Sequence, residues 1–321
     1  HALLPGSPAA GAGSCTDIDG NAITNDQRGV SRPMGDGCDI GAYESEQLPP
    51  PAHVDVTDLS DNGPGSLRQA IADVAPGGTI AIGTPGTIDL AGGQLVIDKD
   101  LTIEGSCNEG GTIISGNGLS RVLYISSGTV NISCVTIRDG DTNGNGGGIR
   151  NRGILTLTDS TVSGNHGERG GGVANDTTMI LTNSTVSGNT SLKQGGGITN
   201  GGRMMTLTNV TITDNSSDTG EGGGFFTIGH AKMINTIVAS NLTGGDCEVP
   251  NASRLRSHGY NLDSDGSCGL VGTNDLSDVD PLLGPLNDNS GPAGPNTINN
   301  RIQTHALLPG SPAAGAGSCT D

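Results

Sequence analysis

Short stretches in which apolar and polar residues alternate recur through the middle of the chain. Four of them read LTLTDSTVSGN (155–165), ILTNSTVSGN (180–189), LTNVTITDN (207–215) and MINTIVASN (233–241). Alternation with a period of two predicts strands that bury one face. The period of about 25 residues is too long for hairpins, so it predicts a solenoid with about three short strands and three turns in each coil.

Each of these stretches follows a glycine triplet. The triplets are 146–148, 170–172, 195–197 and 222–224, and their first glycines are 24, 25 and 27 residues apart. Glycine lets the backbone turn tightly and lets neighbouring segments approach closely. A phosphate-binding loop would need a following Lys and a helix, which the triplets lack. They therefore predict turns between strands.

Asn and Asp residues recur in two columns at the same period. The first column is Asn165, Asn189, Asn215 and Asn241, and the second is Asp159, Asn183, Asn209 and Asn235. If each period is one coil, column members lie about 4.8 Å apart, and stacked amides can hydrogen-bond along the column. Asn183 and Asn209 also begin N-x-Ser/Thr triplets, so a ligand site or a glycan acceptor is the alternative.

The segment before the regular coils predicts a short helix. Ser66 and Gln69 have the spacing of a capping box, and the apolar residues that follow fall on one helical face. We expect residues 54–83 to form an N-terminal cap over the open end of the core. Residues 84–241 then form the coils, and 242–304 form a loop-rich C-terminal cap.

The chain also contains a long-range repeat. Residues 1–17 and 305–321 both read HALLPGSPAAGAGSCTD, an offset of 304 residues from His1 to His305. The simplest interpretation is a tandem array; overlapping ends are the alternative. In an array, 1–48 is the tail of the preceding module, 49–53 is a Pro-rich linker, and 305–321 begins the next tail. We expect 1–48 to pack at or beyond the junction with the module that begins near Val54.

Composition narrows the function classes. The chain has 56 Gly, no Trp, two Phe and three Tyr, so the core must consist mainly of Ile, Leu and Val. Its formal charge of −18 disfavours nucleic acid, whose phosphates require Lys and Arg. The chain has no run of about 18 apolar residues, so no membrane span is predicted.

The seven cysteines become six per module because Cys319 repeats Cys15. With no CxxC motif, sequential disulfides in an oxidising compartment are predicted: Cys15–Cys38, Cys247–Cys268 and, less securely, Cys107–Cys134. Cys134 aligns with the column of Asp159, whereas Cys107 does not. A free, buried thiol at Cys134 is therefore the alternative to the Cys107–Cys134 disulfide. Cys319 should lack a partner.

Several longer motifs carry a family resemblance. The string DPLLGPLNDNSGP…THALLPGSPAAGAG…DQRGVSRPMGDGCDIGAYE resembles the choice-of-anchor C-terminal region of bacterial β-helix surface proteins. GPGSLRQAI resembles the start of the same proteins. The GGGI and TVSGN motifs resemble polymorphic outer-membrane-protein repeats and the pectin-lyase-like superfold. The resemblance implies an all-β, right-handed parallel β-helix that is extracellular or exposed on a bacterial cell surface.

Candidate chemistry is sparse. The polar residues near the glycine triplets include no cluster of Asp or Glu; these residues are Arg150, Asn151, Arg152, Asn175, Asp176 and Asn200. Three histidines, His166, His230 and His258, stand alone, each well separated from the other histidines in the sequence. Two Asx-rich loops, with Asp17 and Asp19 and with Asp263 and Asp265, are calcium candidates, although neither fits a full EF-hand loop. Surface turns are the alternative. We expect no catalytic residues and no cofactor other than calcium.

The sequence therefore predicts a structural repeat unit of a secreted bacterial surface protein. Modules would follow one another head to tail in a fibre, sheath or adhesin stalk, with copies of the chain and surface polysaccharide as candidate partners. The alternative is a polysaccharide-binding or polysaccharide-degrading β-helix protein, a lyase or glycoside hydrolase. Such chemistry would need paired carboxylates, or a carboxylate with a Lys or Arg base, in a groove.

Overall fold

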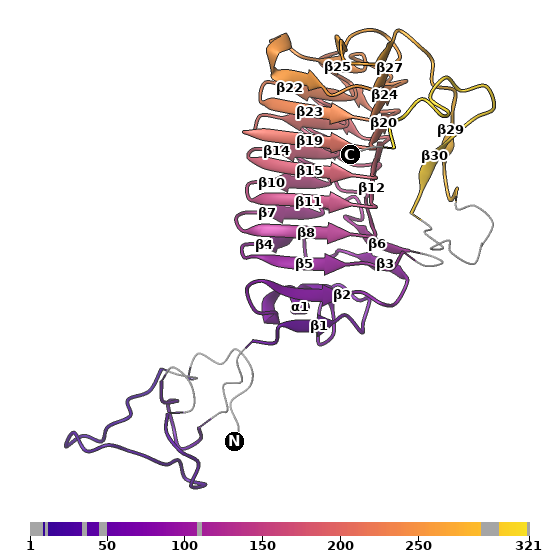
Figure 1. Cartoon of the computed structure of the whole chain (residues 1–321). Helices are drawn as coiled ribbons and strands as arrows, with labels where there is room; N and C mark the ends of the chain where they lie inside the picture. The colour runs from indigo at the N-terminus through magenta and orange to yellow at the C-terminus, as the bar shows by residue number, and fades with distance from the viewer. Residues whose placement is uncertain are drawn as a thin grey trace. The chain divides into compact units, whose positions relative to one another are not determined.

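The computed structural model describes residue 9 and residues 12–33, 37–44, 50–107, 111–289 and 302–319. The chain forms two compact units, His1–Pro51 and Ala52–Asp321. Most of the second unit is a stack of coils (Figure 1).

Three parallel sheets run along the stack. Within the described residues, the first sheet contains β1 (His53–Asp55), β2 (Gly78–Ala81), β5 (Leu101–Glu104), β8 (Thr129–Ser133), β11 (Ile154–Thr158), β15 (Thr178–Thr182), β19 (Met204–Thr208), β23 (His230–Ile234) and β26 (Leu255–Ser257). The second contains β3 (Gly86–Asp89), β6 (Thr112–Ser115), β9 (Val135–Arg138), β12 (Thr161–Ser163), β16 (Thr185–Ser187), β20 (Thr211–Thr213), β24 (Ile237–Ala239), β27 (Leu262–Asp263) and β28 (Leu276–Ser277). The third contains β4 (Leu95–Ile97), β7 (Leu123–Ile125), β10 (Ile149–Asn151), β14 (Val173–Asn175), β18 (Ile198–Asn200), β22 (Phe225–Thr227) and β25 (Cys247–Glu248).

Between two neighbouring strands of one sheet, the chain of a regular coil contributes one strand to each of the other two sheets, as β9 and β10 do between β8 and β11. The strands pair in parallel, as β11 does with both β8 and β15. A short extra sheet, β13 (His166–Gly167), β17 (Thr190–Ser191) and β21 (Ser216–Ser217), lies beside one corner. The fold is therefore a right-handed parallel β-helix. The solenoid that the alternation predicts and the β-helix that the resemblance implies are both confirmed.

The core consists of aliphatic columns. Leu157 lies opposite Ile132 on one side and Leu181 on the other, and all three side chains are buried. The same inward position continues through Leu207 to Met233. Each apolar residue in this column thus packs on similar residues one coil above and below, and Phe225 adds a buried aromatic ring elsewhere in the core.

The glycine triplets lie just before the strands of the third sheet. Gly170 has a φ of +61°, a left-handed conformation that favours glycine. A Cβ on Gly171 would collide with the carbonyl oxygen of Thr190 in the next coil. Glycine is therefore required both for the turn and for the close approach of the coils.

The helix α1 (Leu67–Asp73) covers the N-terminal end of the stack. Leu67, Ala70 and Ile71 are buried against the core, as expected. Ser66 accepts a hydrogen bond from the Gln69 amide, but the Gln69 side chain donates to Asp73. Only that half of the predicted capping box is seen.

The coils extend beyond their predicted bounds. β2 already pairs with β5 inside the segment expected to be cap, and Ala52, inside the expected linker 49–53, accepts a hydrogen bond from Thr79. At the other end, β25 to β28 continue the three sheets past residue 241. These late strands have only two or three residues, which is too short for alternation to reveal. Residues 45–49 lie outside the described residues.

The C-terminal segment folds back onto the coils. β29 (Leu283–Asn287) and β30 (Thr304–Leu307) pair antiparallel beside the stack (Figure 1). Residues 302–319 include most of the second copy of the repeated sequence, and they contact the outer side of the second sheet. The second copy, expected to be the start of the module tail, therefore lies along the flank of the coils. The expected position of residues 1–48 stays a prediction.

The first unit is a small disulfide-closed loop region. Cys15 and Cys38 are bonded, and the buried Glu44 pairs with Arg32 at 3.1 Å. In addition, the Arg28 guanidinium lies 3.7 Å from the centre of the Tyr43 ring. Across both units, no helix in the described residues is long and apolar enough to cross a membrane.

One ion pair fastens the cap to the first coil. Asp61 accepts hydrogen bonds from Arg68, Ala91 and Gly92, and Arg68 also donates to the carbonyls of Gly93 and Gln94. Burial alone would raise the pKa of Asp61, but these hydrogen bonds lower it below its ordinary value.

We predict that Asp61→Asn destabilises the chain by about 2 kcal/mol at pH 7, because charged hydrogen bonds to a buried group are lost. The pKa of Asp61 is lower in the folded than in the unfolded chain. Its contribution is therefore present above the unfolded pKa and disappears as pH falls through the folded value. Thermal unfolding of both proteins between pH 7 and pH 2 would measure this. A stability difference that grows on acidification would contradict the assignment.

Candidate functional site

The first predicted column is a continuous ladder of buried amides. The Nδ2 groups of Asn165, Asn189 and Asn215 each donate to the Oδ1 of the next Asn, at 2.9, 3.0 and 3.0 Å. Each also donates to backbone carbonyls, as Asn189 does to Val162 and Ser187. The Oδ1 atoms of Asn189, Asn215 and Asn241 also accept from the backbone amide of the preceding Asn in the column. The side-chain amides thus hydrogen-bond to the backbone groups at the corner of each coil and join successive coils.

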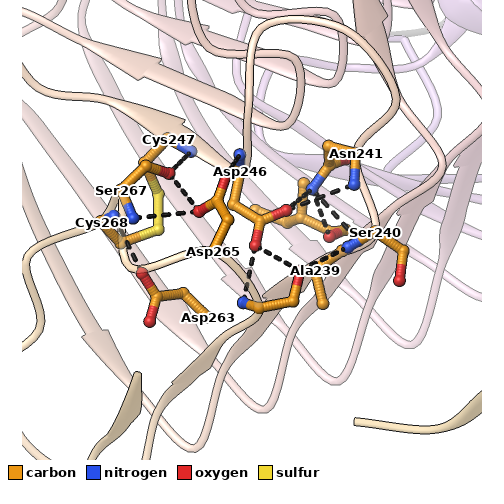
Figure 2. Close-up of a disulfide and its surroundings, with 11 residues drawn as sticks. Ala239, Ser240, Asn241, Asp246, Cys247, Asp263, Asp265, Ser267 and Cys268 are labelled. Carbon is orange, nitrogen blue, oxygen red and sulfur yellow. Dashed lines mark hydrogen bonds between the residues drawn. A yellow bond between two sulfur atoms is a disulfide. The ribbon is translucent and has the colours of Figure 1, made fainter. Parts of the chain in front are cut away.

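Asp246 ends this ladder, and the sequence did not indicate it. Its Oδ1 accepts from the side chain and the backbone amide of Asn241 (Figure 2). Its Oδ2 accepts from the backbone amide and the hydroxyl of Ser264. Burial raises the pKa of Asp246 above its ordinary value, although the hydrogen bonds from Asn241 and Ser264 oppose that shift. An acceptor-only carboxylate suits this position because the last amide of the column has donors left to satisfy.

A second amide ladder is formed by the last residues of successive strands in the third sheet. Asn151 donates to Asn175, Asn175 donates to Asn200, and Asn200 donates to Thr227, at 2.8, 2.8 and 3.0 Å. All four side chains are buried. In the two preceding coils the equivalent residues are Ile97 and Ile125. The sequence analysis identifies these Asn residues only as polar neighbours of the glycine triplets, although their spacing of 24 and 25 residues matches that of the triplets.

The second predicted column marks another corner. Asp159, Asn183, Asn209 and Asn235 have φ between +47° and +55°, and Cys134 has +56°. Asn and Asp tolerate this left-handed conformation better than most residues. The structure records one side-chain bond between neighbours in this column, from Asn209 to Asn183 at 2.9 Å. Its shared feature is therefore the turn conformation, and Asn183 and Asn209 stay exposed.

The structure contains three disulfides: Cys15–Cys38, Cys107–Cys134 and Cys247–Cys268. The alternative of a buried thiol at Cys134 was wrong. Gly105 follows the last register pair, Glu104 with Ser133, so Cys107 lies two residues beyond the position opposite Cys134. The chain turns there and brings the two Cα atoms to 5.0 Å. Cys319 is exposed and unpaired in the described part of the chain.

Three of the four calcium candidates, Asp17, Asp263 and Asp265, accept hydrogen bonds from backbone amides, whereas Asp19 donates its own backbone amide to Asp17. Asp17 accepts from Asp19 and Asn21, which lowers its pKa. Asp265 accepts from Ser267 and Asp246, and the buried Asp263 accepts from Cys268 (Figure 2). The other oxygen of Asp263 has no partner among the described residues. No group of three or more His, Cys, Asp or Glu in that part of the chain could hold a metal ion.

The polar face of the third sheet carries arginines. Arg150 and Arg152 both pair with Asp176, at 3.2 and 3.3 Å, and Arg152 also reaches the Tyr124 hydroxyl. Burial, followed by repulsion from Arg150, lowers the pKa of Arg121. An open cavity of about 500 Å³ lies beside Arg121, lined also by Gln94, Ser120 and Asp141.

The histidines are less isolated than their sequence positions suggested. His166 pairs with Asp141 at 2.9 Å, and His230 contacts Arg254 at 2.8 Å. His258 borders a small cavity with Lys232. No carboxylate pair accompanies any of the three among the described contacts, so the acid and base of a hydrolase are not evident there.

The flank of the coils forms the most specific contact site, which we name the tail seat. It comprises Thr161, Ser187, Asp214 and Asn235 of the coils together with strand β29, and residues 302–319 occupy it. Thr161 donates to the Gln303 carbonyl at 2.6 Å. Asn235 and Ser318 exchange two hydrogen bonds, each of 2.9 Å. The segment is thereby held at both ends.

His305 anchors the middle of the tail seat. Its side chain is 2% exposed; Nδ1 lies 2.7 Å from the Gly284 carbonyl and Nε2 lies 2.8 Å from the Ser187 hydroxyl. Because a carbonyl oxygen only accepts, Nδ1 carries a hydrogen and donates it to Gly284. Nε2 faces the Ser187 hydroxyl, which can donate or accept, and lies 4.0 Å from Asp214 Oδ2. Sequence reasoning missed this site because the partners are 118 and 21 residues away and follow no period.

The chain has little detectable similarity to known proteins. No protein-family model matches the chain, and no curated protein matches it. Among solved structures, the crystal structure of pectate lyase Pel9A is similar, with a TM-score of 0.42 and 15% sequence identity. The match covers 70% of this chain and 73% of that chain.

We predict that Asn189→Ala destabilises the chain by about 3 kcal/mol, because it leaves buried partners on Asn165 and Asn215 unsatisfied. Asn131→Ala, which removes an exposed Asn from β8, is the matched control and should change stability by less than about 0.5 kcal/mol. Denaturant unfolding of the three proteins measures both. Equal effects of the two substitutions would refute the importance of the ladder.

Calcium removal gives a separate test. Because the carboxylates of Asp17, Asp263 and Asp265 already accept hydrogen bonds from the backbone, we expect an excess of EDTA to leave the melting temperature unchanged. Asp263→Asn and Asp17→Asn should behave in the same way with and without added calcium. A rise in melting temperature on adding calcium that Asp263→Asn or Asp17→Asn abolishes would assign a calcium site to that loop.

Proposed function

We propose that this chain is a structural repeat unit of a secreted bacterial surface protein. The unit would recur covalently, head to tail, in an extracellular fibre, sheath or adhesin stalk. The observation that carries the proposal is the tail seat: the second copy of the seventeen-residue repeat is built into the coils that precede it. A repeated sequence with a specific buried seat has a structural reason to recur with every coil stack.

The tail seat also suggests how a period is organised. Residues 302–319 lie along the coils, and the corresponding first copy continues into the disulfide-closed loop region 12–44. In an array, each coil stack would hold the beginning of its own tail, and the rest of the tail would lead to the next module. His305, buried between Gly284 and Ser187, would fix where the tail leaves the coils.

The internal chemistry supports a passive, stable role. Buried Asn side chains of the coils hydrogen-bond to one another in two ladders, and three disulfides lock loops. Disulfides persist in oxidising compartments, which supports an extracellular location. The acidic surface, with a formal charge of −18, suits a soluble polymer that does not collapse on itself.

The second candidate is binding or degradation of polysaccharide, and one observation favours it. Arg121 lines the cavity of about 500 Å³ and lies 5.7 Å from the centre of the Tyr124 ring, and the neighbouring Arg150 and Arg152 share Asp176 as their ion-pair partner. A guanidinium cluster of this kind could bind sugar carboxylates. Degradation would show as turnover in a lyase or reducing-end assay on acidic polysaccharides, and Arg150→Ala would abolish it.

Force spectroscopy on a chain of three periods tests the structural proposal. We predict three equal unfolding events under reducing conditions, each releasing roughly 100 nm of contour, because a period has 304 residues of about 3.5 Å. Oxidised protein should give shorter events, because the disulfides lock loops. His305→Ala in every period should lower the force of the first rupture.

Two outcomes would overturn the structural proposal. One is low-force extension without discrete events, which a load-bearing unit would not show. The other is robust turnover of an acidic polysaccharide by the 321-residue chain, which would make the second candidate the better description.

A further inference from the structure

The outer face of the first sheet carries an unusual distribution of charge. The outward positions of β8, β11, β15 and β19 hold Thr, Ser, Asn, Ile and Met, and none holds a charged residue. We name these positions the uncharged patch. Ile154 and Ile180, which lie within it, are 46% and 37% exposed. On a chain with a formal charge of −18, four consecutive strands without an outward charge are unexpected.

The two ends of the same face are charged with opposite sign. Glu104 on β5 and Asp55 on β1 point outward before the uncharged patch, and Lys232 on β23 and Arg256 on β26 point outward after it. Glu104, Lys232 and Arg256 are exposed and form no ion pair in the described part of the chain. The face is therefore acidic at one end, basic at the other and neutral between.

We propose that this face binds the same face of a second copy, with the two stacks antiparallel. A two-fold axis parallel to the strands, passing between β11 and β15, would place β5 opposite the second copy's β23. It would also place β2 opposite the second copy's β26. The acidic end of each copy then faces the basic end of the other, and the two uncharged patches meet in the centre.

The register places the charges within reach of one another. Glu104 shares a column with Ile234, and Lys232 lies two residues earlier on the same strand. Glu104 would therefore face a position next to Lys232, whose long side chain spans the remaining distance. Arg256 would face β2, between the strands that carry Asp55 and Glu104. A parallel pair of stacks would instead set Glu104 near Glu104 and Lys232 near Lys232.

The area of the face predicts a weak contact. Eight strands at about 4.8 Å, each with about five residues of about 3.3 Å, present about 600 Å² per copy. Stable complexes bury about 800 Å² per partner, so a single module should pair weakly. The tandem arrangement proposed above would sum several such contacts by avidity, and the physiological strength of the pairing rests on that proposal. The contact between single modules does not.

Charge reversal tests the pairing on the 321-residue chain. In sedimentation equilibrium up to about 1 mM, the unmodified chain should show a monomer–dimer equilibrium. Glu104→Lys alone, or Lys232→Glu with Arg256→Glu, should each weaken it about tenfold, because two symmetric contacts become repulsive. Combining all three substitutions should restore the dimer. An equimolar mixture of the two weakened variants should form a heterodimer.

Asp89→Lys is the matched control. Asp89 is an exposed acidic residue on β3 of the second sheet, so the substitution makes the same charge change on another face. It should leave the equilibrium unchanged.

Three results would overturn the pairing. The first is a chain that stays monomeric to about 1 mM, and the second is a dimer that is insensitive to all the reversals. The third is a monomeric chain that adsorbs to an insoluble neutral polysaccharide and loses adsorption in Ile154→Glu with Ile180→Glu. That result would assign the face to a different partner. A failure of the force experiment leaves all three readouts intact, so the two proposals fail separately.

Discussion

Stacking at a fixed spacing is the constraint on which the rest of this structure depends. Every inward residue must fit the residue about 4.8 Å above it and the one below it, because parallel strands in register stack equivalent positions at that spacing. The buried Asn columns satisfy this constraint most strictly. An amide is both donor and acceptor, so identical side chains can hydrogen-bond in series without a gap. A one-residue slip would remove each buried amide from its partner, and the cost of unsatisfied groups resists that slip.

The ladders end where the repeat ends, and the ends differ chemically. Asp246 accepts the last amide donors of one column, and Thr227 takes the last amide of the other. At the opposite end of the stack, α1 covers the aliphatic core and the Asp61–Arg68 pair fastens the cap to the first coil. The flank is occupied by residues 302–319, while the first sheet keeps an exposed face. Ends, flank and face thus have separate roles in one solenoid.

Local periodicity predicted much of this fold, and contacts without a period were not predictable. The alternation in LTLTDSTVSGN and the glycine triplets determine strands and corners, because each reflects the backbone within one coil. The Asn165 column followed from equal spacing, and the Asn151 column could have been found in the same way. The His305 seat and the Asp246 cap could not, since their partners are set by where an irregular loop returns. The register argument at Cys134 failed because Cys107 lies in such a loop.

Native-state hydrogen exchange tests most directly the claim that the amide ladder holds the coils together. The backbone amides of Asn165, Asn189 and Asn215 each donate to an Asn side chain of the next coil. We expect them to exchange only with global unfolding of the stack, and Asn189→Ala to speed exchange at Asn165 first. Exchange at these amides as fast as at exposed turns such as Gly220 would contradict the account.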